Sequence, residues 1–99
     1  MPAVTFIGAA DMFHCSGMVR FGGSTDVFVN GIGISRQGDV NTPHKKPLEG
    51  AAICVLHAQV ITIGSTTVKV NGRGCGRIFD TLTDCTSVAQ GSPNVFAGG

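Results

Sequence analysis

Apolar and polar residues alternate with a period of two along two short stretches of this chain. The first stretch is VFV at residues 27–29, and the second is VKV at residues 68–70. Successive side chains of a strand point to opposite faces, so these β-branched stretches predict short β-strands. An Asn-Gly pair follows each stretch directly. Because Asn and Gly tolerate the positive φ angles of a type I′ turn, each stretch is predicted to begin a β-hairpin.

Both stretches lie inside a longer internal repeat. Residues 23–39 and 64–80 align without gaps, with ten of seventeen positions identical, and each copy ends in an Arg-x-x-Asp corner. Residues 91–99 match the beginning of the repeat a third time, at Gly91, Ser92 and Val95. One hairpin cannot bury its own apolar face. We therefore expect three related hairpins around a common axis, forming a compact all-β unit with approximate threefold internal symmetry.

The segments between the copies do not repeat. Residues 40–62 contain Pro43 and Pro47, and the weak helical period of Leu48–His57 is interrupted by Gly50. We predict loop here, with room for one helical turn, and we also predict loop for residues 11–18.

Length and composition agree with a small β protein. The chain has 99 residues, which suits one domain spanning residues 1–99. Its 15 glycines are about twice the usual share, and its charged fraction of 13% is about half of the usual one. This balance favours short strands and tight turns over an amphipathic helical bundle.

Charge and hydropathy exclude several classes of protein. The net charge is +1 and the seven basic residues are scattered, so we expect no nucleic-acid surface. No apolar run approaches about 18 residues, the length that predicts a transmembrane helix. The first residues lack the basic and apolar regions of a signal peptide. We therefore expect synthesis in a reducing cytoplasm, where cysteines are metal ligands or free thiols more readily than disulfides.

Histidines and cysteines gather outside the repeated hairpins. Loops with little apolar surface need another source of stability, and a closed tetrahedral zinc site with four N or S ligands would supply it. No C-x-x-C or H-x-x-H pair supports such a site, so isolated surface histidines and small buried thiols are an alternative. The residues outside the hairpins are His14, His44, His57, Cys15, Cys54 and Cys85, whereas Cys75 lies within the second hairpin.

A catalytic cysteine–histidine pair is a second alternative to the metal site. A nucleophilic thiolate needs a base within hydrogen-bond reach and a third group that orients the base. Cys15, Cys54 and Cys85 can each be paired with a histidine on paper, but no local signature supports any pair. The glycines do not match the phosphate-binding pattern G-x-x-x-x-G-K-[ST] either. We therefore expect that this protein is not an enzyme.

The stretches GSTDVFVNGIGISRQGD, GSTTVKVNGRG and GSPNVFAGG together resemble the PAAR-repeat proteins. Members of this family are the pointed tips of type VI secretion systems and contractile phage tails. The resemblance covers essentially the whole chain in order. It departs at the Pro-Ala-Ala-Arg tetrapeptide, where Pro2-Ala3 match but Val4-Thr5 do not, and in the second copy. There, Lys69 replaces the usual aromatic residue and Phe79 the usual glycine.

The resemblance implies a fold and a function. The fold would be a short cone with a broad pseudo-threefold base and loops that converge on a metal-bound vertex. The protein would cap and sharpen a trimeric β-helical spike, one tip per trimer, so that the spike pierces target membranes without a transmembrane segment of its own. It would be made in the cytoplasm and assembled at the spike tip of a virion or secretion machine. The alternative is an adaptor that attaches effector proteins to the spike. Because both ends of the sequence lie beside the repeats, we expect such effectors to be separate proteins and not fused toxins.

The resemblance also implies a set of metal ligands. By position these are His14, His44, His57 and Cys85. A set with one thiolate and a tetrahedral preference favours Zn²⁺ over iron. Cys15 and Cys54, which lie close to two of the histidines, rank below these four, and Cys75 is expected to be buried and inert.

Overall fold

The two Asn-Gly pairs turn the chain back on itself in the computed structural model, which describes residues 1–47 and 53–99. The φ angles are 50° and 80° at Asn30 and Gly31, and 52° and 79° at Asn71 and Gly72. Positive φ at both residues of a two-residue loop defines the type I′ turn. Both hairpins therefore form where the sequence predicts. The first turn joins β1 (Phe28–Val29) to β2 (Ile32–Gly33), and the second joins β5 (Lys69–Val70) to β6 (Arg73–Gly74).

Each of these hairpins is followed by the predicted Arg-x-x-Asp corner. Nε of Arg36 lies 2.8 Å from a carboxylate oxygen of Asp39, and Nη2 of Arg77 lies 2.9 Å from one of Asp80. In both corners the backbone N–H of the arginine donates to the same carboxylate, at 2.7 and 2.8 Å. Each aspartate thus satisfies a backbone donor and a side chain at once, which holds the bend.

The third copy pairs with the beginning of the chain. Ala3 lies opposite Phe96, as Gly33 lies opposite Phe28 in the first hairpin. The N–H of Val4 donates to the carbonyl of Val95 at 2.9 Å. The third copy therefore pairs with the N-terminal residues, in the register in which each of the first two copies pairs with its own return strand.

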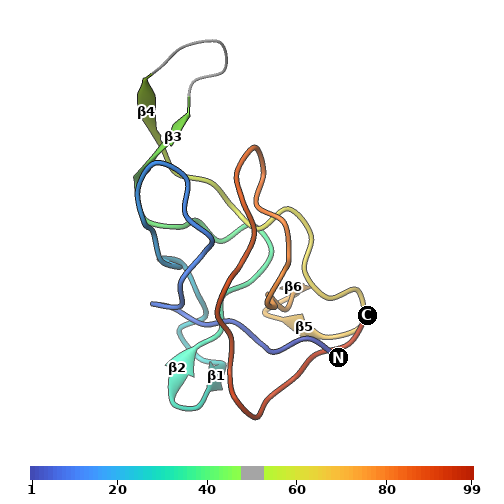
Figure 1. The fold of residues 1–99 in the computed structure, drawn as a ribbon. Helices are drawn as coiled ribbons and strands as arrows, with labels where there is room; N and C mark the ends of the chain where they lie inside the picture. The colour runs from blue at the N-terminus through green and yellow to red at the C-terminus, as the bar shows by residue number, and fades with distance from the viewer. Residues whose placement is uncertain (48–52) are drawn as a thin grey trace.

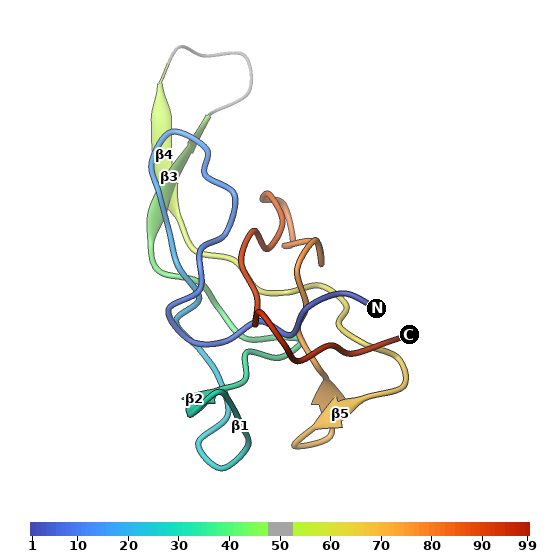
Figure 2. The same ribbon diagram turned by 60° about the horizontal axis from the view of Figure 1, so that its bottom comes forward.

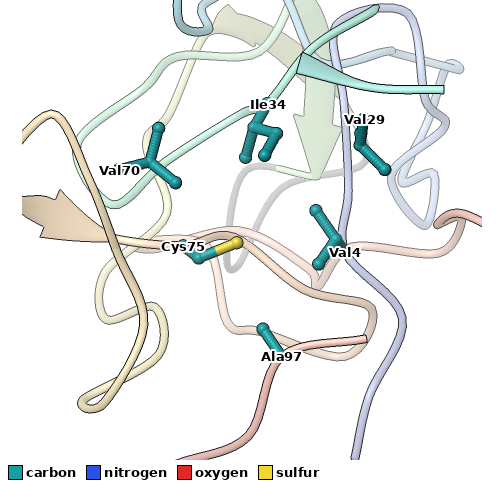
Figure 3. Packing of buried hydrophobic residues seen from close by; sticks show 6 residues of the cluster. All are labelled: Val4, Val29, Ile34, Val70, Cys75 and Ala97. Carbon is teal, nitrogen blue, oxygen red and sulfur yellow. The ribbon is translucent and has the colours of Figure 1, made fainter. Parts of the chain in front are cut away.

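The main apolar core lies between the hairpin segments (Figure 3). Three of its residues, Val29, Val70 and Ala97, occupy the same position in the three copies. The other three come from the return segments, and all six are nearly excluded from water. Burial of a valine- or isoleucine-sized side chain stabilises a fold by about 1.5–3 kcal/mol. The return segments contribute Val4, Ile34 and Cys75, so the predicted burial of Cys75 is confirmed.

Neighbouring copies are joined by hydrogen bonds from the serine of each Gly-Ser pair. The hydroxyl of Ser24 donates to the side chain of Asn71 at 2.7 Å, and that of Ser92 donates to Asn30 at 2.6 Å. The hydroxyl of Ser65 donates to the carbonyl of Gly98, which has the same place in the third copy as the two asparagines in the others. The same serine position therefore joins each copy to another.

A further pair of strands lies between the first and second copies. β3 (His44–Pro47) pairs antiparallel with β4 (Cys54–His57), with His44 opposite His57 and Pro47 opposite Cys54. The predicted loop and helical turn are therefore wrong for residues 44–47 and 54–57, while residues 48–52 lie outside the described part. In short segments, periodicity alone does not distinguish a helix from a strand. Here the pairing of the two segments with each other makes them strands.

The β3–β4 hairpin lies at one end of an elongated molecule, and the two repeat hairpins lie at the other end (Figures 1 and 2). Its extents are 40 × 23 × 22 Å, and β3–β4 projects at the end away from β1–β2 and β5–β6 (Figures 1 and 2). All elements in the described residues are strands, so the predicted all-β class is confirmed. No helix in residues 1–47 or 53–99 is long and apolar enough to cross a membrane.

Candidate metal centre

Four side chains from four separate segments meet at the foot of the β3–β4 hairpin. One ligand atom of each lies within 4.8 Å of the ligand atom of every other. His14 belongs to the loop of residues 11–18, which runs beside the hairpin (Figure 1). His44 begins β3, His57 ends β4, and Cys85 lies in the turn before the third copy. The structure thus brings together the four residues that the resemblance implied.

The distances from the sulfur to the three histidine nitrogens can be compared with those of a tetrahedral site. Sγ of Cys85 lies 2.9 Å from Nε2 of His14, 3.4 Å from that of His44 and 3.7 Å from that of His57. Zinc bonds of about 2.0–2.1 Å to nitrogen and about 2.3 Å to sulfur place N and S ligands about 3.6 Å apart at a tetrahedral angle. The separations to His44 and His57 match this value and that to His14 is shorter, and the four residues together could hold a metal ion.

Strand register places two of the ligands face to face. His44 and His57 are directly opposite in the ladder, and their ring centroids are 4.4 Å apart. Nδ1 of His44 lies 2.9 Å from the carbonyl of Thr42. Since a carbonyl only accepts, Nδ1 carries the proton and donates, which leaves the lone pair of Nε2 directed toward Cys85. The imidazole of His44 is thus held in the tautomer that a metal ligand needs.

A second apolar cluster supports the sulfur ligand. Cys85 packs against the buried residues Ile61, Leu82 and Val88. Its N–H donates to the carbonyl of Leu82 at 3.1 Å. A tight turn and a small core therefore hold Cys85.

The pKa values of two histidines favour the neutral imidazole. Burial lowers the pKa of His14, and the nearby His44 and Lys46 lower it further. Burial also lowers the pKa of His57, and repulsion from the protonated forms of His44 and His14 lowers it further. A neutral imidazole is the form that binds metal, so both side chains are suited to coordination near neutral pH.

A buried polar network connects the segments that carry the three histidines. Nη1 of Arg20 donates to Oδ2 of Asp11 at 3.0 Å, and Nδ2 of Asn41 donates to the same oxygen at 3.1 Å. Oδ1 of Asn41 in turn accepts the N–H of Gln59 at 2.8 Å. Asp11, Asn41 and Gln59 lie two or three residues from His14, His44 and His57 respectively. Sequence analysis missed this network, because no motif or periodicity distinguishes Arg20 from a surface arginine.

The structure corrects the expectation for two cysteines. Cys15 and Cys54 form a disulfide with their Cα atoms 6.3 Å apart, whereas we expected free thiols or ligands. A separation of 39 residues gives no sign of this contact, which arises because the loop carrying Cys15 runs along β3–β4. Neither cysteine belongs to the quartet. The free thiols are those of Cys75 and Cys85.

Comparisons of the chain with protein-family models and with curated proteins find no match. The chemistry of the centre is therefore inferred from its own donor set. Three imidazoles and one thiol can fill all four positions of a tetrahedral ion, which is the arrangement of a structural site and leaves no position for a substrate.

Proposed function

We propose that His14, His44, His57 and Cys85 bind one structural Zn²⁺ ion. The convergence of their ligand atoms within 4.8 Å supports this proposal. The ion would join four segments that share little apolar surface, and its binding free energy would contribute directly to folding. One thiolate among imidazoles favours zinc over iron in a tetrahedral site.

We further propose that the protein is a structural tip that caps the trimeric β-helical spike of a contractile injection machine, as its resemblance to PAAR-repeat proteins implies. The observation that carries this proposal is one hydrogen bond that recurs in all three copies. In each, the serine of the Gly-Ser pair donates its hydroxyl to a residue of another copy. A trimer presents three equivalent strand ends, and a single chain that covers all three must offer the same feature three times. A base with threefold symmetry would meet that requirement.

Exposed apolar side chains near the hairpins support docking on a partner. Phe28 and Phe96 occupy the same position of the first and third copies, and both are exposed. An exposed phenyl ring at the same position of two copies offers apolar surface to a partner, and free hairpin edges can add to a neighbouring sheet. The second copy has Lys69 at this position, so the three sides of the base would not be chemically identical.

Native mass spectrometry on the protein co-expressed with a β-helical spike tests the tip proposal. We expect one chain per spike trimer, with one zinc ion identified by elemental analysis. Phe28→Ala combined with Phe96→Ala should weaken the complex. Phe13→Ala, which changes an exposed phenylalanine in the loop beside β3–β4, should leave it intact. A folded, metal-free protein that binds no spike would refute the proposal.

An adaptor role is the second candidate, and exposed aromatic residues outside the hairpin turns favour it. Phe21 and Phe79 present most of their side chains to solvent. An effector protein that docks there would be retained on the spike only when this chain is present. Pull-down of an effector from the same machine, lost in Phe21→Ala, would support the adaptor role.

A cysteine nucleophile is the competing chemistry, since Sγ of Cys85 lies 2.9 Å from Nε2 of His14. Metal coordination would occupy that sulfur and exclude catalysis. The zinc-loaded protein should therefore hydrolyse no ester or peptide, and its Cys85 should resist alkylation until the metal is removed.

A further inference from the structure

The Cys15–Cys54 disulfide joins two ligand-bearing segments that, in the described part of the chain, contribute to neither apolar cluster. Cys15 directly follows His14, and Cys54 shares the four-residue strand β4 with His57. The central part of the loop of residues 11–18 is called the 12–17 loop. Among residues 1–47 and 53–99, neither apolar cluster includes a residue of the 12–17 loop or of β4. Nδ1 of His57 is buried without a hydrogen-bond partner in the same described residues.

The other two ligands are anchored without the disulfide. His44 is only 2% exposed and donates to Thr42. Cys85 packs on the second apolar cluster. The β3–β4 ladder holds His57 opposite His44. The position of His14 therefore depends most on how the 12–17 loop is attached to the hairpin.

Few other contacts attach that loop to the hairpin. The N–H of Cys15 donates to the carbonyl of Lys45 at 3.2 Å, and the N–H of Lys45 donates to the hydroxyl of Ser16 at 2.8 Å. The second of these bonds is exposed to solvent. Water competes for such bonds, so they restrain the loop weakly. A covalent bond between Cys15 and Cys54 restrains it far more.

We propose that the Cys15–Cys54 disulfide is a redox-dependent latch that positions His14 against His57 and so determines how tightly the centre retains its metal. This inference rests on the proposed metal function. The disulfide keeps His14 close to His57 before the ion binds, so metal binding has to remove less conformational entropy from the loop. Coupling between two sites is reciprocal, so the bound ion favours formation of the disulfide by the same factor.

Closing the latch is a thiol–disulfide exchange. The thiolate of one cysteine attacks a donor disulfide, RSSR, and forms a mixed disulfide while one RSH leaves. The thiolate of the other cysteine then displaces the second RSH. The two cysteine thiols are oxidised, the donor is reduced to two thiols, and the bond between Cys15 and Cys54 forms. In a reducing cytosol the latch would be open, and in an oxidising compartment it would be closed.

Metal release measures the latch directly, with Co²⁺ as a probe because its visible absorption reports bound thiolate and imidazole. The protein is loaded with Co²⁺ after its thiols have been counted, and is mixed with excess EDTA, with and without a phosphine reductant. We expect reduction to accelerate release by about tenfold, within the usual range of coupling between sites. Cys15→Ser combined with Cys54→Ser should release at the fast rate in both conditions. Cys75→Ala, which removes a thiol outside the centre, should respond to reduction as the wild type does.

Equal release rates from the oxidised and reduced wild-type protein would overturn the latch. A double variant that releases as slowly as the oxidised protein would do the same.

Amide hydrogen exchange on the metal-free protein separates this inference from the metal proposal. The N–H groups of Cys15 and Lys45 bond across the loop and the hairpin. Faster exchange at both after reduction supports the positioning role even if no ion is ever bound. Unchanged exchange at both overturns it, whatever the metal content.

Discussion

Arg20 and Asp11 form an ion pair whose side chains are both completely buried, with Nη1 of Arg20 3.0 Å from Oδ2 of Asp11. Replacing Arg20 by Met would leave the carboxylate of Asp11 buried without its charge partner. We expect a loss of about 3–5 kcal/mol in the free energy of unfolding, the usual effect of removing one member of a buried pair. Urea unfolding measures this loss. Arg73→Ala is the control, because half of the Arg73 side chain is exposed in its pair with Asp39, and it should cost less than about 1 kcal/mol.

The effect of Arg20→Met should depend on pH. Burial already raises the pKa of Asp11, and Arg20 opposes that shift. Without Arg20 the folded-state pKa rises further above the unfolded value of about 3.9. Stability linked to such a carboxyl is present below the unfolded pKa and is lost as pH rises through the folded pKa. The difference between variant and wild type should therefore be smaller at about pH 4 than at pH 7, and an equal difference at both would show that Asp11 is not the cause.

His57→Ala should remove metal and stability together. His57 contributes one of the four ligand atoms, and metal binding is coupled to folding. We expect the bound zinc to fall from one ion per chain toward zero, with a lower melting temperature and a loss of at most several kcal/mol. Leu56→Ala alters the neighbouring, exposed residue of the same strand and should keep the metal. An unchanged metal content and melting temperature in His57→Ala would remove His57 from the ligand set.

Phe79→Gly should stabilise the protein. Phe79 has a φ of 71°, a left-handed conformation that the first copy gives to Gly38, at 86°. That conformation costs a residue with a Cβ atom about 1–2 kcal/mol, partly offset by the extra freedom of glycine in the unfolded chain. We expect a gain of about 1 kcal/mol by thermal or urea unfolding. The mirror change, Gly38→Ala, should destabilise by a similar amount, and a loss of stability in Phe79→Gly would mean that the phenyl ring makes contacts that outweigh the backbone strain.

Cys75 should be inert to alkylating reagents in the folded protein. Burial raises the pKa of its thiol to about 11, and the residue is 1% exposed. Because the thiolate is the reactive form, iodoacetamide at pH 8 should label Cys75 only after unfolding. Peptide mapping of the metal-free protein provides the comparison, since Cys85 is less buried and should react first.

The sequence predicted the elements that depend on local chemistry. Asn30-Gly31 and Asn71-Gly72 identify their turns because few residue pairs accept two positive φ angles in succession. The Arg-x-x-Asp corners likewise need only residues three positions apart. For the quartet, the resemblance implied the residues that the structure brings together. Spacing alone could not, because the ligands come from four segments that the fold makes adjacent.

What sequence analysis missed depends on contacts between distant segments. The strands β3 and β4 exist because each pairs with the other, and neither has a strong pattern alone. The Cys15–Cys54 bond follows from where the loop lies, and the burial of Arg20 follows from packing around it. None of these contacts leaves a periodic signal in the chain.

Pairing between the first and last described segments has a consequence for how the protein folds. The hydroxyl of Thr5 donates to the carbonyl of Gln90, 85 positions away, and Ala3 lies opposite Phe96. During synthesis the backbone groups of Pro2 and Val4 that pair with Val95 and Ala97 have no partner until residues 91–97 emerge, and such long-range pairing is typical of slow folding. Chains cut short before those residues would leave an open strand edge, which is prone to aggregation. Folding would thereby discriminate between chains that include the third copy and chains that lack it.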